Sequence, residues 1–137
     1  MILLCGIPSE SPLALVGDAL ERIGAPYRWF HQRHFEQTEM AFELGDMGLS
    51  GWLEINGEGV ALDSVRGIYS RLMDHSRLPE LKDEAHDSPL TQHCNALHDT
   101  LIRWTEISPA RVVNRIAAMG SNSSKPYQAQ LIREHGF

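Results

Sequence analysis

The 137-residue sequence is poor in cysteine, has no run of basic residues and has no long apolar stretch. Its two cysteines, Cys5 and Cys94, are too few for a disulfide scaffold. The formal net charge of -6 disfavours nucleic-acid binding, because an acidic surface repels phosphate groups. No apolar segment approaches the ~20 residues that span a bilayer, and no basic region of a signal peptide follows Met1. These absences predict a cytoplasmic protein that binds neither nucleic acid nor membrane.

The sequence also lacks the loops that commonly bind nucleotides. The first predicted strand-to-helix loop, Ile7 to Pro12, carries prolines and a glutamate where a dinucleotide-binding turn needs glycines, and we interpret it mainly as a helix cap. The segment from Met119 to Lys125 superficially resembles a phosphate-binding loop. However, Ser124 and Pro126 stand where that motif needs a second glycine and a final Ser or Thr. The start of this predicted helix could still bind an anion, and the same residues could simply cap the helix.

Patterns for catalysis or metal binding are equally sparse. The sequence contains no Gly-x-Ser-x-Gly elbow and no catalytic Cys–His signature. His93 and His98 are five positions apart, so on one helix they diverge by roughly 140° and do not suit a shared metal. We therefore predict no catalytic residue and no metal ligand, and we expect the histidines to be mainly exposed to solvent.

What is present is an ordinary globular composition, with 42% hydrophobic and 22% charged residues, which predicts one domain over residues 1 to 137. The apolar run from Ile2 to Ile7 favours a central parallel strand that is covered on both faces. Ser11 and Pro12 favour the start of a helix that ends before Gly24, and Tyr27 to Phe30 favours a second strand. This order is a βαβ unit with parallel strands.

Later elements follow the same alternation of strands and helices. Alternating residues on both sides of Asn56-Gly57 predict a β-hairpin from Leu53 to Leu62. The other predictions are a loop over residues 31–50, a strand over 67–70, an exposed loop over 73–88, a long helix between Ser88 and Pro109, a short buried strand at Val112-Val113, and a final helix from about Lys125 to His135. Together they predict an α/β fold, an open, mainly parallel, doubly wound sheet with helices on both faces and an inserted β-hairpin.

The last third of the chain resembles one family. The segments Val112-Val113-Asn114-Arg115, Ala118-Met119, Ser121 to Gln128, Leu131-Ile132 and Gly136-Phe137 are similar to the junction before the catalytic core of ATP-grasp ligases, in particular the ribosomal-protein glutamate ligases and the peptide macrocyclases. Gly67 to Arg71 resembles a strand of that family that ends in an arginine. The resemblance covers residues 65–72 and 110–137, and the opening βαβ unit agrees only at the level of the fold.

This resemblance implies a pre-ATP-grasp domain, with residues 115–137 as the junction towards an ATP-grasp core that the chain does not contain. In such ligases ATP phosphorylates a carboxylate, and an amine then attacks the acyl phosphate. The resemblance implies ATP and magnesium as cofactors of a full-length parent ligase and none for this chain, which we expect to be inactive by itself. The implied partners are the downstream core and a carboxylate or peptide substrate, and the implied role is acceptor binding and domain packing.

Candidate binding residues lie where predicted parallel strands end. Arg71 follows one strand, and Asn114 and Arg115 follow another, at the edge where open α/β sheets bind ligands. Arginine makes bidentate contacts with carboxylate or phosphate, so we predict that these residues bind substrate. Ser124 and Lys125 are candidates for an anion-binding helix start. An equal alternative is that Arg71 and Arg115 form structural ion pairs.

Two other functions stay open from the sequence. A free-standing module could bind a small acid or a peptide at the same sheet edge. An independent flavodoxin-like enzyme is less favoured, because no catalytic constellation is present. The final predicted helix carries Tyr127, Leu131 and Ile132 close to the chain end, where the parent's next domain would cover them. We therefore expect either a homodimer that buries this region or high mobility of the last helix.

Overall fold

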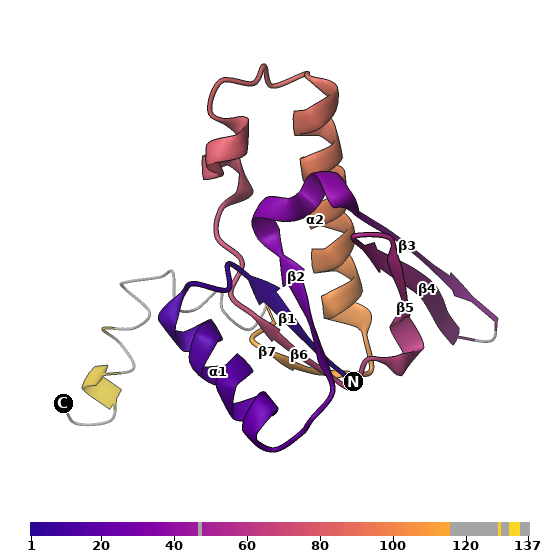
Figure 1. Cartoon of the computed structure of the whole chain (residues 1–137), viewed down its shortest axis with the longest axis vertical. Helices are drawn as coiled ribbons and strands as arrows, with labels where there is room; N and C mark the ends of the chain where they lie inside the picture. Colours follow the sequence, from indigo (N-terminus) through magenta and orange to yellow (C-terminus); the bar gives the residue numbers. More distant parts are fainter. Residues whose placement is uncertain (47, 116–128, 130–131, 135–137) are drawn as a thin grey trace.

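The computed structural model describes residues 1–46, 48–115, 129 and 132–134, and in these residues the chain forms two sheets and two α-helices (Figure 1). The first sheet has the order β2-β1-β6-β7, and all its neighbouring strands are parallel. Its strands are β1 (Ile2–Gly6), β2 (Tyr27–His31), β6 (Gly67–Ser70) and β7 (Arg111–Val113). The predicted interior position of the first strand is confirmed.

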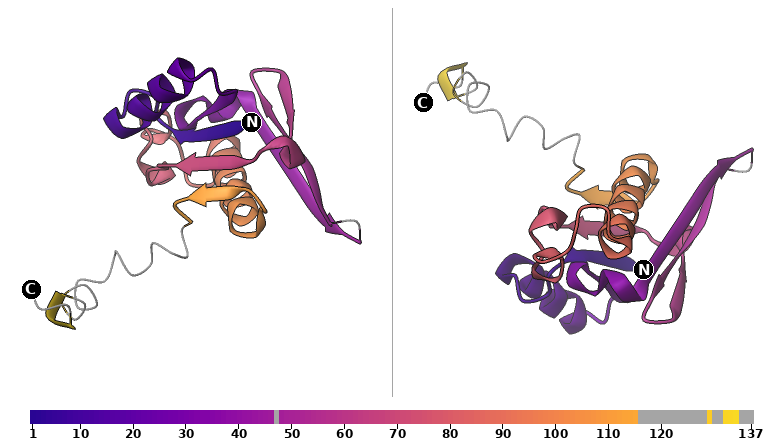
Figure 2. Two further views of the ribbon diagram at one scale, coloured as in Figure 1. Left: turned by 90° about the horizontal axis from the view of Figure 1, so that it is seen from below. Right: turned by 90° about the horizontal axis from the view of Figure 1, so that it is seen from above.

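The helices α1 (Ser11–Arg22) and α2 (Pro89–Ile107) cover opposite faces of this parallel sheet (Figure 2). Alternate residues of β1 serve the two faces, since Leu3 and Cys5 join the core under α2 while Leu4 lies beside Gly17 of α1. A Cβ atom on Gly17 would lie 2.9 Å from the ring of Trp29, so this glycine lets α1 approach the sheet closely. The α/β, doubly wound architecture is thus confirmed.

Helix α2 follows its predicted pattern. The Ser88 hydroxyl accepts a hydrogen bond from the Thr91 N–H at 3.1 Å, and Pro89 occupies the first helical position. The stripe of Cys94, Leu97, Leu101 and Trp104 is buried. Helix α1 differs in detail, because Ser11 is its first residue and Glu10 occupies the capping position without a capping side-chain hydrogen bond. Within the described part of the chain, neither helix has both the length and the apolarity to cross a bilayer.

The second sheet is antiparallel, with the order β3-β4-β5. Its strands are β3 (Thr38–Gly45), β4 (Gly48–Ile55) and β5 (Glu58–Ala61). The predicted hairpin around Asn56-Gly57 is confirmed as β4–β5, and both turn residues have the positive φ that this tight turn needs, 52° and 79°.

The predicted loop over residues 31–50 is wrong. It contains the 3₁₀ helix η1 (Gln32–Gln37), all of β3 and the start of β4. Met40 and Phe42 do alternate with polar or small residues, but Leu44 on the same face is 73% exposed. This alternation is itself a strand pattern, and the structure shows it as β3 paired with β4.

Two further local predictions need correction. The segment 73–88 is not simply an exposed loop, because its 3₁₀ helices η3 (His75–Arg77) and η4 (Pro79–Leu81) place Leu78 and Leu81 in the core. The strand at Val112-Val113 is not buried, because β7 is the edge of the parallel sheet and Val113 is 43% exposed. A short 3₁₀ helix (η2, Leu62–Ser64) leads from β5 to β6. The predicted final helix falls largely outside the described residues.

Candidate functional site

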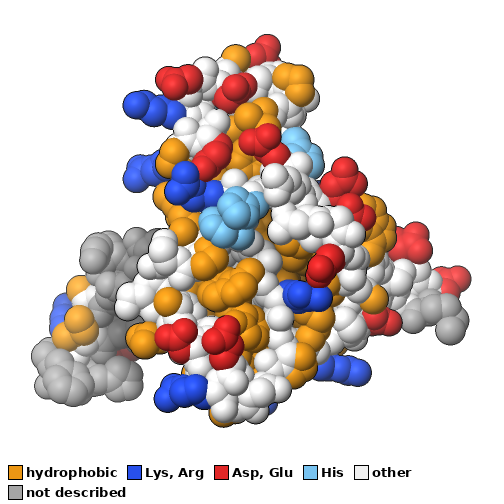
Figure 3. Space-filling model, in the orientation of Figure 1, with side chains coloured by type: hydrophobic (Ala, Val, Ile, Leu, Met, Phe, Trp, Pro, Cys, Tyr) orange, Lys and Arg blue, Asp and Glu red, His pale blue; other side chains and the backbone are white. Residues whose placement is uncertain are grey.

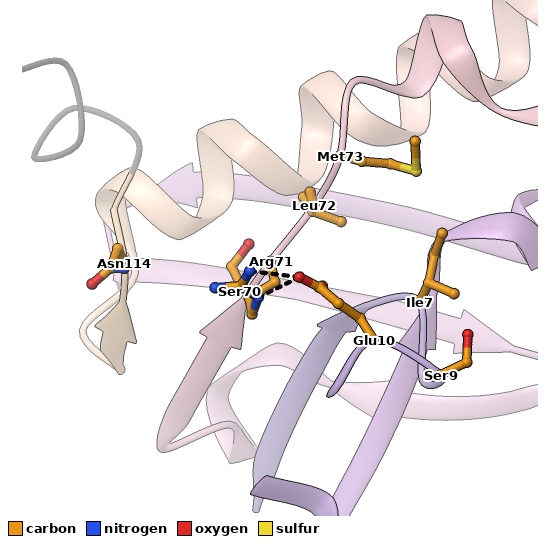
Figure 4. A pocket seen from close by; sticks show the side chains of 8 residues that line it. All are labelled: Ile7, Ser9, Glu10, Ser70, Arg71, Leu72, Met73 and Asn114. Carbon is orange, nitrogen blue, oxygen red and sulfur yellow. Dashed lines mark hydrogen bonds and ion pairs between the residues drawn. The ribbon is translucent and has the colours of Figure 1, made fainter. Parts of the chain in front are cut away.

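A pocket of about 500 Å³ opens where the parallel strands end (Figure 4). The loop after β1, the segment after β6 and the residue after β7 all contribute to it. Its walls are Ile7, Ser9, Glu10, Ser70, Arg71, Leu72, Met73 and Asn114. This is the edge at which open parallel sheets commonly bind ligands, so the pocket is a candidate site.

A close backbone approach shapes the floor of the pocket. The Arg71 N–H donates to the Cys5 carbonyl at 2.8 Å, which ties the end of β6 to the end of β1. Gly6 has a φ of 147°, and a Cβ atom there would lie 2.9 Å from the Arg71 carbonyl oxygen. A side chain at this position would therefore force the two strand ends apart, and only glycine allows the observed geometry without strain.

The Arg71 guanidinium is held by the carboxylate of Glu10, the residue that precedes α1. Its Nε and Nη2 atoms donate to Oε1 of Glu10 at 2.8 and 2.5 Å. This hydrogen bond raises the pKa of Arg71 above its ordinary value, with a smaller contribution from Tyr69. The two side chains are 41% and 35% exposed, so solvent screens the pair and its contribution to stability is modest. An incoming anionic group would compete with Glu10 for the guanidinium.

Asn114 brings an exposed amide to the same pocket from the end of β7, and in Figure 4 Arg71 lies between Asn114 and Glu10. The amide supplies both a donor and an acceptor, and Ser9 and Ser70 add hydroxyl groups. The site therefore combines one cation, one carboxylate and neutral hydrogen-bonding groups beside the apolar side chains of Leu72 and Met73. Such a mixture suits a polar or charged group attached to an apolar or peptide-like body.

The structure places Arg115 away from this pocket. Its guanidinium donates to the carbonyls of Thr105, Glu106 and Ser108, the last two at 2.7 and 2.9 Å. These carbonyls belong to the end of α2, where a cation satisfies unpaired acceptors and complements the helix dipole. Of the predicted residues, the structure thus brings Arg71 and Asn114 together, while Arg115 stabilises the end of α2. Ser124 and Lys125 lie outside the described residues.

Sequence reasoning missed the role of Glu10. The sequence predicts a helix cap in the loop from Ile7 to Pro12. In the structure the Glu10 side chain makes no capping hydrogen bond and instead accepts one from Arg71, 61 positions away. The pairing of the predicted strands was the one signal that could have brought Glu10 and Arg71 together. A parallel pairing of β1 with β6 brings the loops that follow them to one edge, so Glu10 and Arg71 had to be neighbours once that pairing was assumed.

A second polar cluster lies on the buried side of α2. It shows that the prediction of exposed histidines is wrong for His98. His98 is 1% exposed, its Nδ1 atom lies 2.9 Å from the Cys94 carbonyl oxygen, and its ring stacks on His75 with 4.8 Å between centroids. Burial lowers the pKa of His98, and burial raises the pKa of the Cys94 thiol to about 11. A thiol with that pKa is almost fully protonated at neutral pH, so Cys94 is a core residue and not a nucleophile.

Comparison with solved structures identifies similar folds. The macrocyclase MdnC from Microcystis aeruginosa MRC, bound with its precursor peptide MdnA, matches with a TM-score of 0.76 and 19% identity over 100% of this chain and 45% of its own. A RiPP-associated ATP-grasp ligase from Chryseobacterium gregarium, in complex with ADP and leader and core peptides, matches with a TM-score of 0.76 and 15% identity over 99% of this chain and 41% of its own.

The ATP-grasp ligase PsnB, complexed with a precursor peptide and AMPPNP, matches with a TM-score of 0.59 and 23% identity over 99% of this chain and 44% of its own. No protein-family model matches the sequence, and no curated protein matches it either. The chain spans less than half the length of each of these three structures. The likeness at these identities shows the fold, which is that of one part of the macrocyclase and ligase chains.

Proposed function

We propose that this chain is the amino-terminal, pre-ATP-grasp domain of a carboxylate–amine ligase that acts on a peptide, and that the pocket around Arg71 contacts the acceptor. The observation that carries the proposal is the fold likeness over 99–100% of this chain to parts of two ligases and a macrocyclase, all three in complex with peptides. The pocket at the carboxyl ends of the strands adds a place where such a peptide would be held.

The chemistry of the pocket favours a carboxylate-bearing peptide as the ligand. Arg71 presents a planar guanidinium that matches a carboxylate, and Asn114 can bind either an amide or a carboxylate oxygen. Two donors of the guanidinium, Nε and Nη2, already bind Glu10, so a ligand carboxylate must displace Glu10 or bind beside it. The pocket would therefore bind an isolated acid weakly and gain affinity from the apolar contacts with Leu72 and Met73.

The described residues do not fit a magnesium nucleotide. The amino-terminal end of α1 is the natural place for a phosphate, but Glu10 occupies its capping position and would repel one. The described part of the chain also offers no cluster of three metal-binding side chains for the magnesium ion. We therefore propose that ATP and magnesium bind to other parts of the parent protein, and we derive no step of the reaction through them.

Calorimetry on the 137-residue chain tests this proposal. A short peptide with a glutamate side chain should bind, its glutamine analogue should bind ~10-fold more weakly, and Arg71→Gln should abolish the difference between the two peptides. Mg-ATP should give no tight binding, and micromolar affinity for it would contradict the proposal. The coding sequence beyond Phe137 offers an independent check, because the proposal requires an ATP-grasp core there.

A further inference from the structure

Strand β3 leaves one edge of the antiparallel sheet open. Among the described residues it pairs only with β4, and the β3–β4 hairpin extends away from the parallel sheet on the side of α2 opposite to α1 (Figures 1 and 2). The hairpin is therefore well separated from the pocket around Arg71. Long exposed edge strands pair readily with another extended chain unless the edge is blocked, so this edge is a candidate interaction surface.

The backbone N–H and C=O groups of successive β3 residues point alternately towards β4 and away from it. The Asn56 N–H donates to the Gln37 carbonyl, so odd-numbered residues direct their backbone groups towards β4. Even-numbered residues direct theirs outward, as the Thr38 carbonyl confirms by lying 3.2 Å from the Nε2 atom of His93 on α2. Beyond Thr38, the outward groups belong to Met40, Phe42 and Leu44, and no hydrogen bond to them from the described residues is present at this edge.

Apolar side chains on one face of the β3–β4 hairpin extend from the core towards the exposed tip. Leu53 is fully buried against the core, Phe42 and Leu49 are half-buried, and Leu44 near the tip is 73% exposed. These residues share one face by their register, in which Leu44 lies opposite Leu49. A strand that joined β3 would therefore place every second side chain against an apolar surface that is now partly open to water.

The other face of the hairpin is acidic (Figure 3). Glu39 lies directly opposite Glu54, and neither carboxylate has an ion pair with a described residue. Like charges in this position destabilise a sheet, and a cation between them would remove that cost. Trp52 lies on the same face, opposite Ala41, and is 44% exposed, so its ring can contact a cationic side chain.

We propose that the open edge of β3, from Met40 to Leu44, binds an extended peptide segment in which apolar residues alternate with lysine or arginine. The segment adds a strand to the sheet through the outward backbone groups of β3. Its apolar side chains lie beside Phe42 and Leu44, and its cationic side chains lie over Trp52 and the glutamates. A second copy of the chain fits less well, because it would bring its own Glu39 and Glu43 to the same acidic surface. This surface is distinct from the pocket in the proposed function.

A peptide of about ten residues with alternating lysine and valine is the probe. Fluorescence polarisation on the 137-residue chain should show 1:1 binding that weakens with salt, because charge attraction contributes. An analogue with N-methyl groups on alternate backbone amides keeps the charge and side chains but cannot form the ladder, and it should bind ~10-fold more weakly. Equal binding of the two peptides, or no binding of the first, would overturn the proposal.

Two protein variants locate the surface. Leu44→Lys adds a charge on the apolar face and should weaken binding ~10-fold, because an inward-facing lysine blocks strand addition. Leu15→Lys is the matched control, since Leu15 is also largely exposed (65%) but lies on α1, and it should change affinity less than ~2-fold. Circular dichroism establishes that both variants fold.

If both variants weaken binding equally, the effect is general electrostatics and the proposal fails. Light scattering of the chain without peptide tests whether a second copy occupies the edge. A dimer of the wild-type chain that Leu44→Lys converts to a monomer would assign the edge to a second copy instead.

Discussion

The two sheets of this protein place their apolar side chains in different environments. The parallel sheet lies between α1 and α2, and Leu3 and Leu4 on its central strand are both fully buried. The antiparallel sheet has core contacts on one face near its base, and towards the tip its apolar face is open, as at Leu44. The difference teaches that strand type alone does not decide burial. The parallel sheet is covered on both faces, whereas the antiparallel sheet adds Leu53 and Val60 to the core and leaves the apolar face open at its tip.

The largest expected contrast comes from one truncation in each sheet. Leu4→Ala removes a fully buried side chain and leaves a cavity beside Gly17, so it should lower the free energy of unfolding by ~2–5 kcal/mol. Leu44→Ala removes a side chain that is 73% exposed and should change the free energy of unfolding by less than ~0.5 kcal/mol. Urea denaturation of both variants measures the contrast. Equal losses would mean that the hairpin is part of the cooperative core.

A glycine inside the hairpin provides a smaller effect that is local. A Cβ atom on Gly51 would lie 2.4 Å from the Ala41 carbonyl oxygen and 2.7 Å from the Phe42 Cα, so Gly51→Ala must distort the β3–β4 pairing. We expect a loss of ~1–3 kcal/mol, with faster hydrogen exchange in β3 and β4 than in β1. Gly59→Ala is the matched control, because nothing lies within 4 Å of a Cβ atom there. A similar loss in both variants would contradict the steric explanation.

The pH dependence of stability should come more from the core under α2 than from the hairpin. Burial, opposed by the hydrogen bond to the Cys94 carbonyl and reinforced by His75, lowers the pKa of His98 below its ordinary 6.5. The folded state thus binds this proton less readily than the unfolded state. The stability from neutral His98 is complete above pH 6.5 and is lost as the pH falls below it, towards the lowered pKa.

Denaturation midpoints between pH 7 and pH 5 measure this loss. His98→Gln should make the slope shallower, whereas substitution of the exposed His86 by Gln should leave it unchanged. If His98→Gln keeps the full slope, other groups carry the pH dependence.

Only a small effect on stability is expected at the pocket. Glu10→Gln breaks an ion pair whose side chains are 35% and 41% exposed, so the free energy of unfolding should change by less than ~1 kcal/mol. The same change frees the Arg71 guanidinium and should raise the affinity for a carboxylate-bearing peptide. Thermal denaturation and calorimetry separate the two effects. A large loss of stability with no gain in affinity would make this pair a structural contact.

Regular patterns were predictable from the sequence wherever one face was fully buried. The stripe of α2, the run of β1 and the Asn56-Gly57 turn each have a local physical cause, and the structure confirms all three. Strand β3 was missed although Met40, Phe42 and Leu44 alternate with Glu39, Ala41 and Glu43, which is a pattern that predicts a strand. His98 was misplaced because position 98 lies beside the apolar stripe, and the rings that pack against it, those of Phe30 and His75, come from distant parts of the chain.

Part of the pocket was predictable for a similar reason. Arg71 and Asn114 follow strands directly, so the rule for parallel sheets located them. Arg115 follows the same strand as Asn114, but its side chain turns to the carbonyls at the end of α2, and no sequence pattern encodes the direction of a long side chain.

The sequence by itself determined the elements whose interactions are local, namely the capped helix α2, the tight turn at Asn56-Gly57 and the apolar central strand β1. Helix caps and turns depend on residues a few positions apart, so their physical causes are contained in short segments. Only the tertiary structure decided that Glu10 meets Arg71 and that the edge of β3 stays open. Both depend on which strands become neighbours, and that pairing joins residues far apart in the chain through contacts that no short segment contains.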